Sequence, residues 1–378
     1  MKQFIYADNA ATTKLDIDAF EAMKPYLLDE YGNASQPYSF ARKPKQALKE
    51  ARATIAQCIN AEPEEIFFTS GGTESDNWAI KGMAFADSEK RAIITSQIEH
   101  HAVLNACADV ERLGYPVAYL PVTAEGVVTA ETLNSVITSN TRLVSVMYAN
   151  NEIGTIEPIK ELCEIAHRNG ALFHTDAVQA VGHVQIDVKK LGVDILSASA
   201  HKFNGPKGIG FLYIKKGTPI ASYASGGAQE FGMRAGTENI ASIVGMAVAL
   251  KKNCDNLAEN IHHIENIESH LIDKLSSSGL DFVRNGSSQH IPGNVSLSFK
   301  NADGEALLHR LDLMGICVST GAACDTVNTE VSHVLKSIGL KHEYAIGTIR
   351  VTLSANNTAD NVIAIADALK NILSPERI

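Results

Sequence analysis

The sequence of 378 residues lacks several features that mark whole classes of protein. No run approaches the roughly 20 apolar residues of a membrane helix, so we expect no membrane association. The six cysteines include no C-x-x-C pair and are too few for a disulfide framework in so long a chain. Positive charge is also scarce. With 33 Lys and Arg against 43 Asp and Glu, the net charge of −10 argues against direct binding of nucleic acid.

Three glycine-containing signatures are absent as well. The chain has no G-x-x-x-x-G-K-[ST] loop, no G-x-S-x-G elbow, and no G-x-G-x-x-G at a strand–helix turn. Nucleotide hydrolysis and serine esterase chemistry therefore lose their main support. The first residues also lack the apolar stretch of a signal peptide. Together with the cysteine usage, this favours a protein of the reducing cytoplasm.

Short apolar runs alternate with helical patterns through the first two thirds of the chain. Such runs are typical of a parallel sheet that helices cover on both faces. The last third differs, with one long helical stretch predicted over 239–275 and shorter strands and helices after it. We predict an α/β fold. Its large domain, with a mostly parallel sheet flanked by helices, covers 15–255, and a smaller α+β domain combines 1–14 with 256–378.

Ligands of open α/β sheets bind outside the carboxyl ends of the strands, so residues that follow strands are candidates for a site. The segment 69–74 joins a strand to a helix and contains Gly71 and Gly72. Flexible backbone and unpaired N–H groups at the helix start suit a phosphate. The alternative is a plain turn with Thr73 as the helix N-cap.

A lysine and an aspartate also follow predicted strands. Partial burial of Lys202 lowers the pKa of its amine and lets it form a Schiff base with an aldehyde cofactor. For a lysine taken alone, an exposed ammonium is commoner. Asp176 can pair with a protonated pyridine nitrogen, or it caps a following helix.

Three further residues suggest chemistry. His100 either stacks on a planar cofactor or fills space. We expect no metal site, because the adjacent rings of His100 and His101 do not face one side. Cys324 lies among small, turn-forming residues and is the best candidate for a reactive thiol. Arg350, in a β-like run, either clamps a carboxylate or is an edge-strand charge that faces solvent.

These segments together resemble the cysteine desulfurases of the pyridoxal-phosphate class V aminotransferase superfamily (fold type I). The resemblance runs nearly end to end and is specific because nine segments occur in family order. They are Tyr6–Thr13, Gly32–Asn33, Thr69–Asn77, Glu99–His100, Asn150–Gly154, His174–Gln179, Ser199–Lys202, Arg234–Thr237 and Gly321–Cys324. The resemblance implies pyridoxal 5'-phosphate as cofactor. It also implies conversion of L-cysteine to L-alanine, with a persulfide left on Cys324 for a sulfur-acceptor or scaffold protein.

The resemblance also implies a role for each matching residue. Lys202 matches the lysine that binds the cofactor, Asp176 the partner of its ring nitrogen, and His100 the stacking, acid–base histidine. The remaining contacts match Gly72, Thr73, Ser199 and His201 for the phosphate, Asn151 and Gln179 for the ring, Asn33 and Arg350 for the substrate carboxylate, and Thr237 for a phosphate contact from the neighbouring subunit. A homodimer with shared active sites follows from the last of these.

Other interpretations stay open at this point. The same cofactor serves aminotransferases and selenocysteine lyases, and a degenerate relative could be a non-catalytic dimeric scaffold. The sulfur could enter iron–sulfur cluster biosynthesis, tRNA thiolation or DNA sulfur modification.

Overall fold

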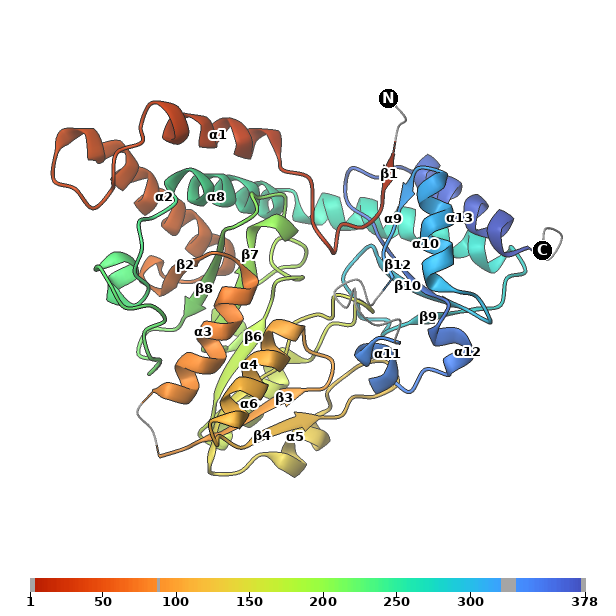
Figure 1. Cartoon of the computed structure of the whole chain (residues 1–378), viewed down its shortest axis with the longest axis horizontal. Coiled ribbons are helices and arrows are strands. Elements are labelled where there is room, and N and C mark those ends of the chain that lie inside the picture. The colour runs from red at the N-terminus through yellow and green to blue at the C-terminus, as the bar shows by residue number, and fades with distance from the viewer. Residues whose placement is uncertain (1–3, 87–88, 321–330, 375–378) are drawn as a thin grey trace.

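The structure, a computed structural model, describes residues 4–86, 89–320 and 331–374. A seven-stranded sheet with helices on both faces forms the larger part, and a smaller part lies beside it (Figure 1). The predicted α/β fold is confirmed. The strands of the large sheet, in their spatial order, are β2 (Ile66–Thr69), β8 (Gly210–Ile214), β7 (Ile195–Ser199), β6 (Leu172–Asp176), β5 (Thr141–Ser145), β3 (Ala92–Ser96) and β4 (Val117–Leu120).

The strands β3, β4, β5, β6 and β7 run parallel, and β8 is antiparallel to both β7 and β2. Every residue of β5, β7 and β8 is buried. A strand with both faces covered has no solvent side, which explains why these segments are continuous rather than alternating apolar runs.

Helices cover the two faces of this sheet. One apolar cluster joins α3 (Gly72–Phe85) and α4 (His101–Arg112) to one face. Another joins α2 (Arg42–Ile59), α6 (Ile159–Arg168) and α8 (Ile240–Asp255) to the opposite face. The other elements of this part are α1 (Ile17–Leu28), α5 (Ala130–Val136), α7 (Val188–Leu191), and the 3-10 turns η1 (Ser39–Ala41), η2 (Pro63–Glu65), η3 (Ala200–Lys202) and η4 (Gln229–Gly232).

The stretch predicted as one helix is two helices. α8 ends at Asp255 and α9 (Leu257–Ser276) begins after Asn256, whose side-chain amide donates to the Lys252 carbonyl at 2.8 Å. Asparagine side chains compete in this way with the backbone bonds of a helix. Within the described residues, no helix is long and apolar enough to cross a membrane.

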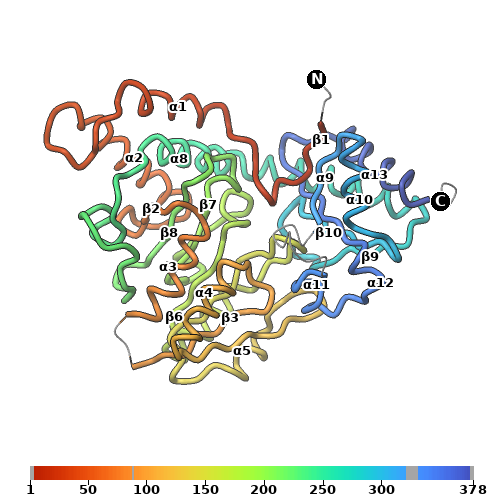
Figure 2. The backbone as a smooth tube through the Cα atoms, viewed as in Figure 1, coloured from red at the N-terminus to blue at the C-terminus, as the bar shows by residue number. Residues whose placement is uncertain are grey.

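The smaller part has its own apolar cluster, built from α9, the sheet β12-β10-β9 and Ala7 near the N-terminus. Its other elements are β9 (Phe282–Asn285), β10 (Asn294–Phe299), α10 (Gly304–Leu313), β11 (Ile316–Cys317), α11 (His333–Ser337), α12 (His342–Ala345), β12 (Thr348–Thr352) and α13 (Ala359–Leu373). The strand β1 (Ile5–Tyr6) pairs with β11, and the chain then crosses to the large part and enters α1 (Figure 2).

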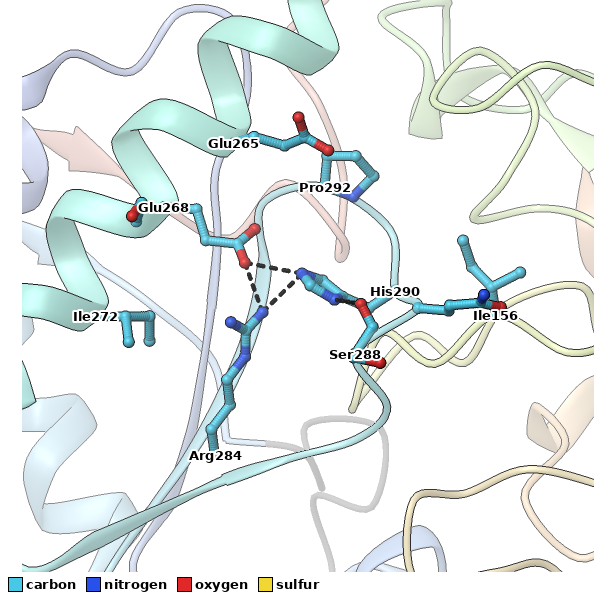
Figure 3. Close-up of a pocket in the computed structure, with 10 residues that line it drawn as sticks. Ile156, Glu265, Glu268, Ile272, Arg284, Ser288, His290 and Pro292 are labelled. Carbon is cyan, nitrogen blue, oxygen red and sulfur yellow. Dashed lines mark hydrogen bonds and ion pairs between the residues drawn. The ribbon is translucent and has the colours of Figure 1, made fainter.

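A loop of the smaller part is fastened to the segment that follows β5. Ile156 donates its N–H to the Gln289 carbonyl at 2.9 Å, and Ile291 donates to Gly154 at the same distance. A cavity of about 510 Å³ lies beside this loop. Glu268 of α9 contacts Arg284 and His290 across it (Figure 3) and also accepts the Gly293 N–H at 2.6 Å.

We predict that Glu268→Gln lowers the free energy of unfolding by about 2–3 kcal/mol, the scale of hydrogen bonds to a buried charged group. Burial alone would raise the pKa of Glu268, but His290, Arg284 and the Gly293 N–H outweigh it and lower that pKa. The stabilisation is therefore present above the ordinary pKa of a glutamate and is lost as pH falls through the lowered value.

Urea unfolding at pH 7 and pH 4 measures both effects. Glu265→Gln is the matched control, because Glu265 lines the same cavity from the same helix but is exposed. Equal stability of the two variants at pH 7 would contradict the prediction.

Candidate active site

The polar residues predicted from sequence gather where parallel strands end. Asp176 is the last residue of β6, Ser199 is the last residue of β7, and Lys202 ends the turn η3 directly after β7. His100 follows β3 and precedes α4. Because parallel strands present their carboxyl ends at one edge of a sheet, these side chains share one region.

Lys202 does not extend its amine into bulk solvent. Its Nζ donates to the carbonyl of Ala10 at 2.6 Å and to that of Ala11 at 2.9 Å. Gln179 donates its side-chain amide to the same Ala10 carbonyl at 3.0 Å. His183 Nε2 lies 2.8 Å from the Lys202 carbonyl and so holds the backbone at the lysine. The N-terminal segment thus brings Lys202 and Gln179 to one point.

Asp176 is 5% exposed, and its Oδ1 accepts the Val178 N–H at 2.9 Å. Burial raises the pKa of this carboxyl to about 6, and the hydrogen bond and the charge of Lys202 limit the rise. The alternative that Asp176 caps a helix is wrong, because no helix follows β6 until α7 begins at Val188.

His100 caps α4, with its Nδ1 accepting the Ala102 N–H at 3.1 Å. Burial, followed by the positive charge of Lys202, lowers the pKa of His100 to about 4. The ring is therefore neutral near pH 7. Since Nδ1 accepts a hydrogen bond, the ring proton lies on Nε2, and His100 offers one donor toward the region of Lys202.

The loop before α3 has the geometry of an anion cradle. Gly71 has φ +146°, which L side chains rarely adopt, and it lies next to Ser199. A Cβ on Gly72 would meet Val178 Cγ2 at 2.7 Å. The N-cap is Gly71 rather than Thr73, so the alternative of a turn capped by Thr73 is wrong. The backbone comes close to Ser199 and Val178 while the first N–H groups of the helix remain available to an anion.

These residues fit pyridoxal phosphate. The cradle before α3 suits its phosphate, the buried carboxyl of Asp176 its ring nitrogen, and Lys202 its aldehyde. His201 lies beside the same region, with its Nδ1 3.1 Å from Thr12 Oγ1. Burial is the first cause that lowers the pKa of His201 to about 4.

Arg350 lies on β12, where it is buried, so the alternative of a solvent-facing edge charge is wrong. It donates to Asp8 Oδ1 at 2.8 Å and to the Asn151 carbonyl at 2.9 Å. Its Nε is buried without a hydrogen-bond partner among the described residues. The guanidinium therefore links the smaller part to Asn151 of the large part and keeps one donor for another group.

Asn33 and Thr237 lie in different surroundings. Asn33 lies in the connection between α1 and α2, and its Oδ1 accepts the Ser35 N–H. This connection lies on the opposite side of the molecule from β12 (Figure 1). Within one chain the structure does not bring Asn33 alongside Arg350. Thr237 lines a cavity of about 160 Å³ together with Ser70, at the edge of the anion cradle.

Cys324 lies outside the described residues, but both borders of its segment are anchored near the site. Ser319 pairs with Arg350 through two backbone hydrogen bonds. On the other side, Ser332 donates to Glu152 Oε2 at 2.6 Å, and the ring of His333 lies 4.9 Å from that of His101.

The sequence analysis assigned no role to four residues that shape this region. Asp8 receives Arg350, His183 holds the backbone of Lys202, and Asp76 lies 3.8 Å from His174 behind Asp176. Asp8, Asp76 and His174 fall within segments that carry the resemblance, which was the available signal. His183 lies outside those segments, and nothing in the sequence singled it out.

Comparisons with known proteins agree with this geometry. The family model Aminotransferase class-V matches residues 5–365. "Cysteine desulfurase IscS" of Clostridium botulinum is 47% identical and covers 100% of this chain and 96% of that protein. The protein of the same name from Methanosarcina thermophila is 46% identical, over 99% of this chain and 93% of its own length.

Solved structures show the same likeness. A "NIFS-like protein" has a TM-score of 0.92 at 38% identity and covers 98% of this chain and 99% of its own. "SspA in complex with cysteine" has a TM-score of 0.83 at 34% identity, covering 94% of this chain and 100% of its own.

We predict that Gly71→Ala destabilises the protein by about 1–3 kcal/mol, because a side chain at φ +146° is strained. It should also weaken binding of pyridoxal phosphate at least about tenfold, since relief of the strain moves the cradle. Urea unfolding and a titration followed by visible absorption measure the two effects.

Gly114→Ala is the matched control. Gly114 also has a positive φ, +87°, but it lies after α4 with nothing within 4 Å of the added Cβ. This variant should lose stability and keep the cofactor affinity. An unchanged affinity in Gly71→Ala would count against the cradle.

Proposed function

The chain belongs to the class-V aminotransferase family and is a pyridoxal-phosphate-dependent cysteine desulfurase, and from this premise we propose how its residues divide the work. The division follows the domains predicted above. Residues 15–255 hold the cofactor, while 1–14 and 256–378 contribute the carboxylate clamp and the sulfur carrier. The convergence of Lys202, Asp176 and His100 at the carboxyl ends of the parallel strands β7, β6 and β3 is the observation on which the proposal depends most.

The cofactor, when bound, supplies an aldehyde that joins amines and a ring that withdraws electrons from the amino-acid substrate. Lys202 binds it covalently, and Asp176 keeps a negative charge at the ring nitrogen. The phosphate is held by Gly72, Thr73, Ser199 and His201, and the ring is contacted by His100, Asn151 and Gln179. The hydrogen bonds of Lys202 to Ala10 and Ala11 support a position for its amine at the mouth of the site.

Lys202 and His100 transfer protons to and from the substrate. With L-cysteine in the site, Lys202 Nζ would take the α-proton of the substrate. The neutral His100 donates its Nε2–H to the sulfur atoms of L-cysteine and Cys324. Its Nδ1 is not free for this role, because it accepts the Ala102 N–H.

Arg350 and Asn33 bind the carboxylate of L-cysteine. Support for Arg350 comes from its buried Nε, which has no partner among the described residues and suits an anionic oxygen. The connection that contains Asn33 lies on the opposite side of the molecule from β12, so we propose that Asn33 acts at the site of a second subunit.

Cys324 accepts the sulfur. Its thiolate attacks the sulfur atom of L-cysteine, an S–S bond forms, and the C–S bond breaks. A proton replaces the sulfur on the released L-alanine, and Cys324 keeps a persulfide for the thiol of an acceptor protein. The anchoring of the bordering residues Ser319 and Ser332 beside the site supports this role.

A homodimer would complete the site. The face formed by α1 and the connection after it exposes large apolar side chains, which a monomer in water would rarely leave uncovered together. They are Ile17, Phe20, Leu27, Leu28, Tyr31, Tyr38 and Phe40. Covering this face with a second copy would bring Asn33 to an interface, and Thr237 would then serve the phosphate of the neighbouring subunit.

We place the protein in the cytoplasm and its sulfur in iron–sulfur cluster biosynthesis. The cysteine usage supports the compartment. The 46–47% identity to cysteine desulfurases named IscS supports the pathway. Transfer of labelled sulfur from L-cysteine to a scaffold protein tests the pathway.

Cys324→Ala should keep the visible absorption of the bound cofactor and lose alanine formation by more than about 100-fold, since a nucleophile has been removed. The assay measures L-alanine from L-cysteine, with and without a keto acid. Keto-acid dependence would indicate an aminotransferase instead.

Cys317→Ala is the matched control, because Cys317 is partly buried on β11 and burial is the first cause that raises its pKa. Its turnover should be normal. Alanine formation retained in Cys324→Ala and lost in Cys317→Ala would overturn the assignment.

Arg350→Lys should raise the KM for L-cysteine about 10–100-fold with a smaller effect on kcat, because a lysine keeps the charge but cannot bind a carboxylate with two parallel hydrogen bonds. Steady-state kinetics measures the split. Arg284→Lys, at the remote cavity of Figure 3, should leave both constants unchanged. A normal KM in Arg350→Lys would rule out the clamp.

A further inference from the structure

A second buried carboxyl lies behind Asp176. Asp76 is the fifth residue of α3, the helix that starts at the anion cradle, and it is 1% exposed. Ser197 lies near enough to its side chain to act on its pKa, while its Oδ1 is buried with no hydrogen-bond partner among the described residues. The proposed mechanism uses no part of this group.

Asp76 of α3 and Asp176 of β6 both lie near Ser197 of β7. Asp176 lies opposite Ser197 in the register of β6 and β7, and His174 lies two residues before Asp176, on the same face of β6. His174 Nε2 is 3.0 Å from Ser197 Oγ and 3.8 Å from Asp76 Oδ1. Asp76, Ser197 and His174 thus form one buried polar cluster, in which Ser197 Oγ and His174 Nε2 are within hydrogen-bond distance.

No positive charge faces Asp76 in the described part of this chain. The charged groups that act on it are Asp176 and, more weakly, Glu99, and both are acidic. His174 is fully buried, and burial lowers its pKa to about 3, so its ring is neutral. Burial, and then the charge of Asp176, raises the pKa of Asp76 well above its ordinary value.

Asp176 differs from Asp76 in what surrounds it. It accepts the Val178 N–H and faces Lys202, and both favour its ionised form. Two adjacent buried carboxyls do not both ionise readily, so the one with the donor and the cation takes the charge.

We propose that Asp76 is a positioning residue that retains its proton, and that it thereby leaves Asp176 as the ionised member of the pair, opposite the ring nitrogen of the cofactor. This proposal rests on the role of Asp176 proposed above. The proton also orders the chain behind the site. Asp76 donates to Ser197, Ser197 donates to His174 Nε2, and His174 Nδ1–H donates to Ser145 Oγ, 2.8 Å away. An ionised Asp76 would reverse every bond and move the ring proton of His174 to Nε2.

The first test uses the full chain freed of cofactor, unfolded in urea between pH 5 and pH 9 at fixed protein concentration. Asp76→Asn keeps the shape and neutrality of the protonated acid. An acid that retains its proton in the folded state loses stability as pH rises above its unfolded pKa. The folding constant of the parent protein relative to Asp76→Asn should therefore fall tenfold per pH unit, about 1.4 kcal/mol. A ratio independent of pH would overturn the proposal.

The second test asks whether Asp176 is the cause. The Asp176→Asn substitution removes the like charge beside Asp76, so Asp76 should ionise in the folded protein at a lower pH. The folding constant with Asp76, relative to that with Asp76→Asn, should therefore stop falling at a lower pH in this background. An unchanged profile would overturn the positioning role. Glu157→Gln is the control. Burial is the first cause that raises the pKa of Glu157, whose carboxylate accepts the Val128 N–H rather than contacting Asp176. The pH dependence of stability in Glu157→Gln should therefore be alike with and without Asp176→Asn.

Should Asp76→Asn fail to fold, the parent protein still provides a measurement. Nitrogen-15 NMR of histidine-labelled protein reports which ring nitrogen of His174 is protonated, with the signal assigned from His174→Gln. A proton on Nδ1 supports the proposal, and a proton on Nε2 overturns it. The visible absorption of Asp176→Asn holoprotein tests the role of Asp176 separately. An unchanged absorption there would remove that role without altering the results from cofactor-free protein.

Discussion

The parallel pairing of β3, β5, β6 and β7 is the constraint on which the rest of the site depends. It brings the carboxyl ends of four strands to one edge, where His100, the segment after β5, Asp176 and Lys202 leave the sheet together. None of these residues is adjacent to another along the chain. Covering helices exclude water from both faces of the sheet, and this exclusion shifts the pKa values at its edge.

The N-terminal segment is the second element that builds the site. Residues 5–8 pair with strands of the smaller part, and the carbonyls of Ala10 and Ala11 accept hydrogen bonds from Lys202. One short stretch therefore touches both parts of the molecule. Asp8 and Arg350 add an ion pair to the same seam, in which Arg350 is buried and Asp8 is partly buried.

Burial also sorts the titratable groups by charge. His100, His174 and His201 are neutral because burial lowers their pKa values, while burial raises the pKa values of Asp76, Glu99 and Asp176. Among these three carboxyls, Asp176 is the one that Lys202 faces, so ionisation costs the least free energy at Asp176. An electron-withdrawing ring with a protonated nitrogen suits that arrangement.

The sequence by itself determined the α/β class and the family, because apolar runs report burial and the nine segments occur in one order. It also singled out Lys202, Asp176 and His100 as candidates. It left the choice between alternatives at Asp176, Arg350 and Thr73 open, since capping, exposure and strain depend on the neighbours that the fold places around a residue. The carbonyls that receive Lys202 and the contact of Asp76 with His174 were decided by tertiary structure alone. Each joins groups that only folding brings together, and no spacing along the chain encodes such a distance.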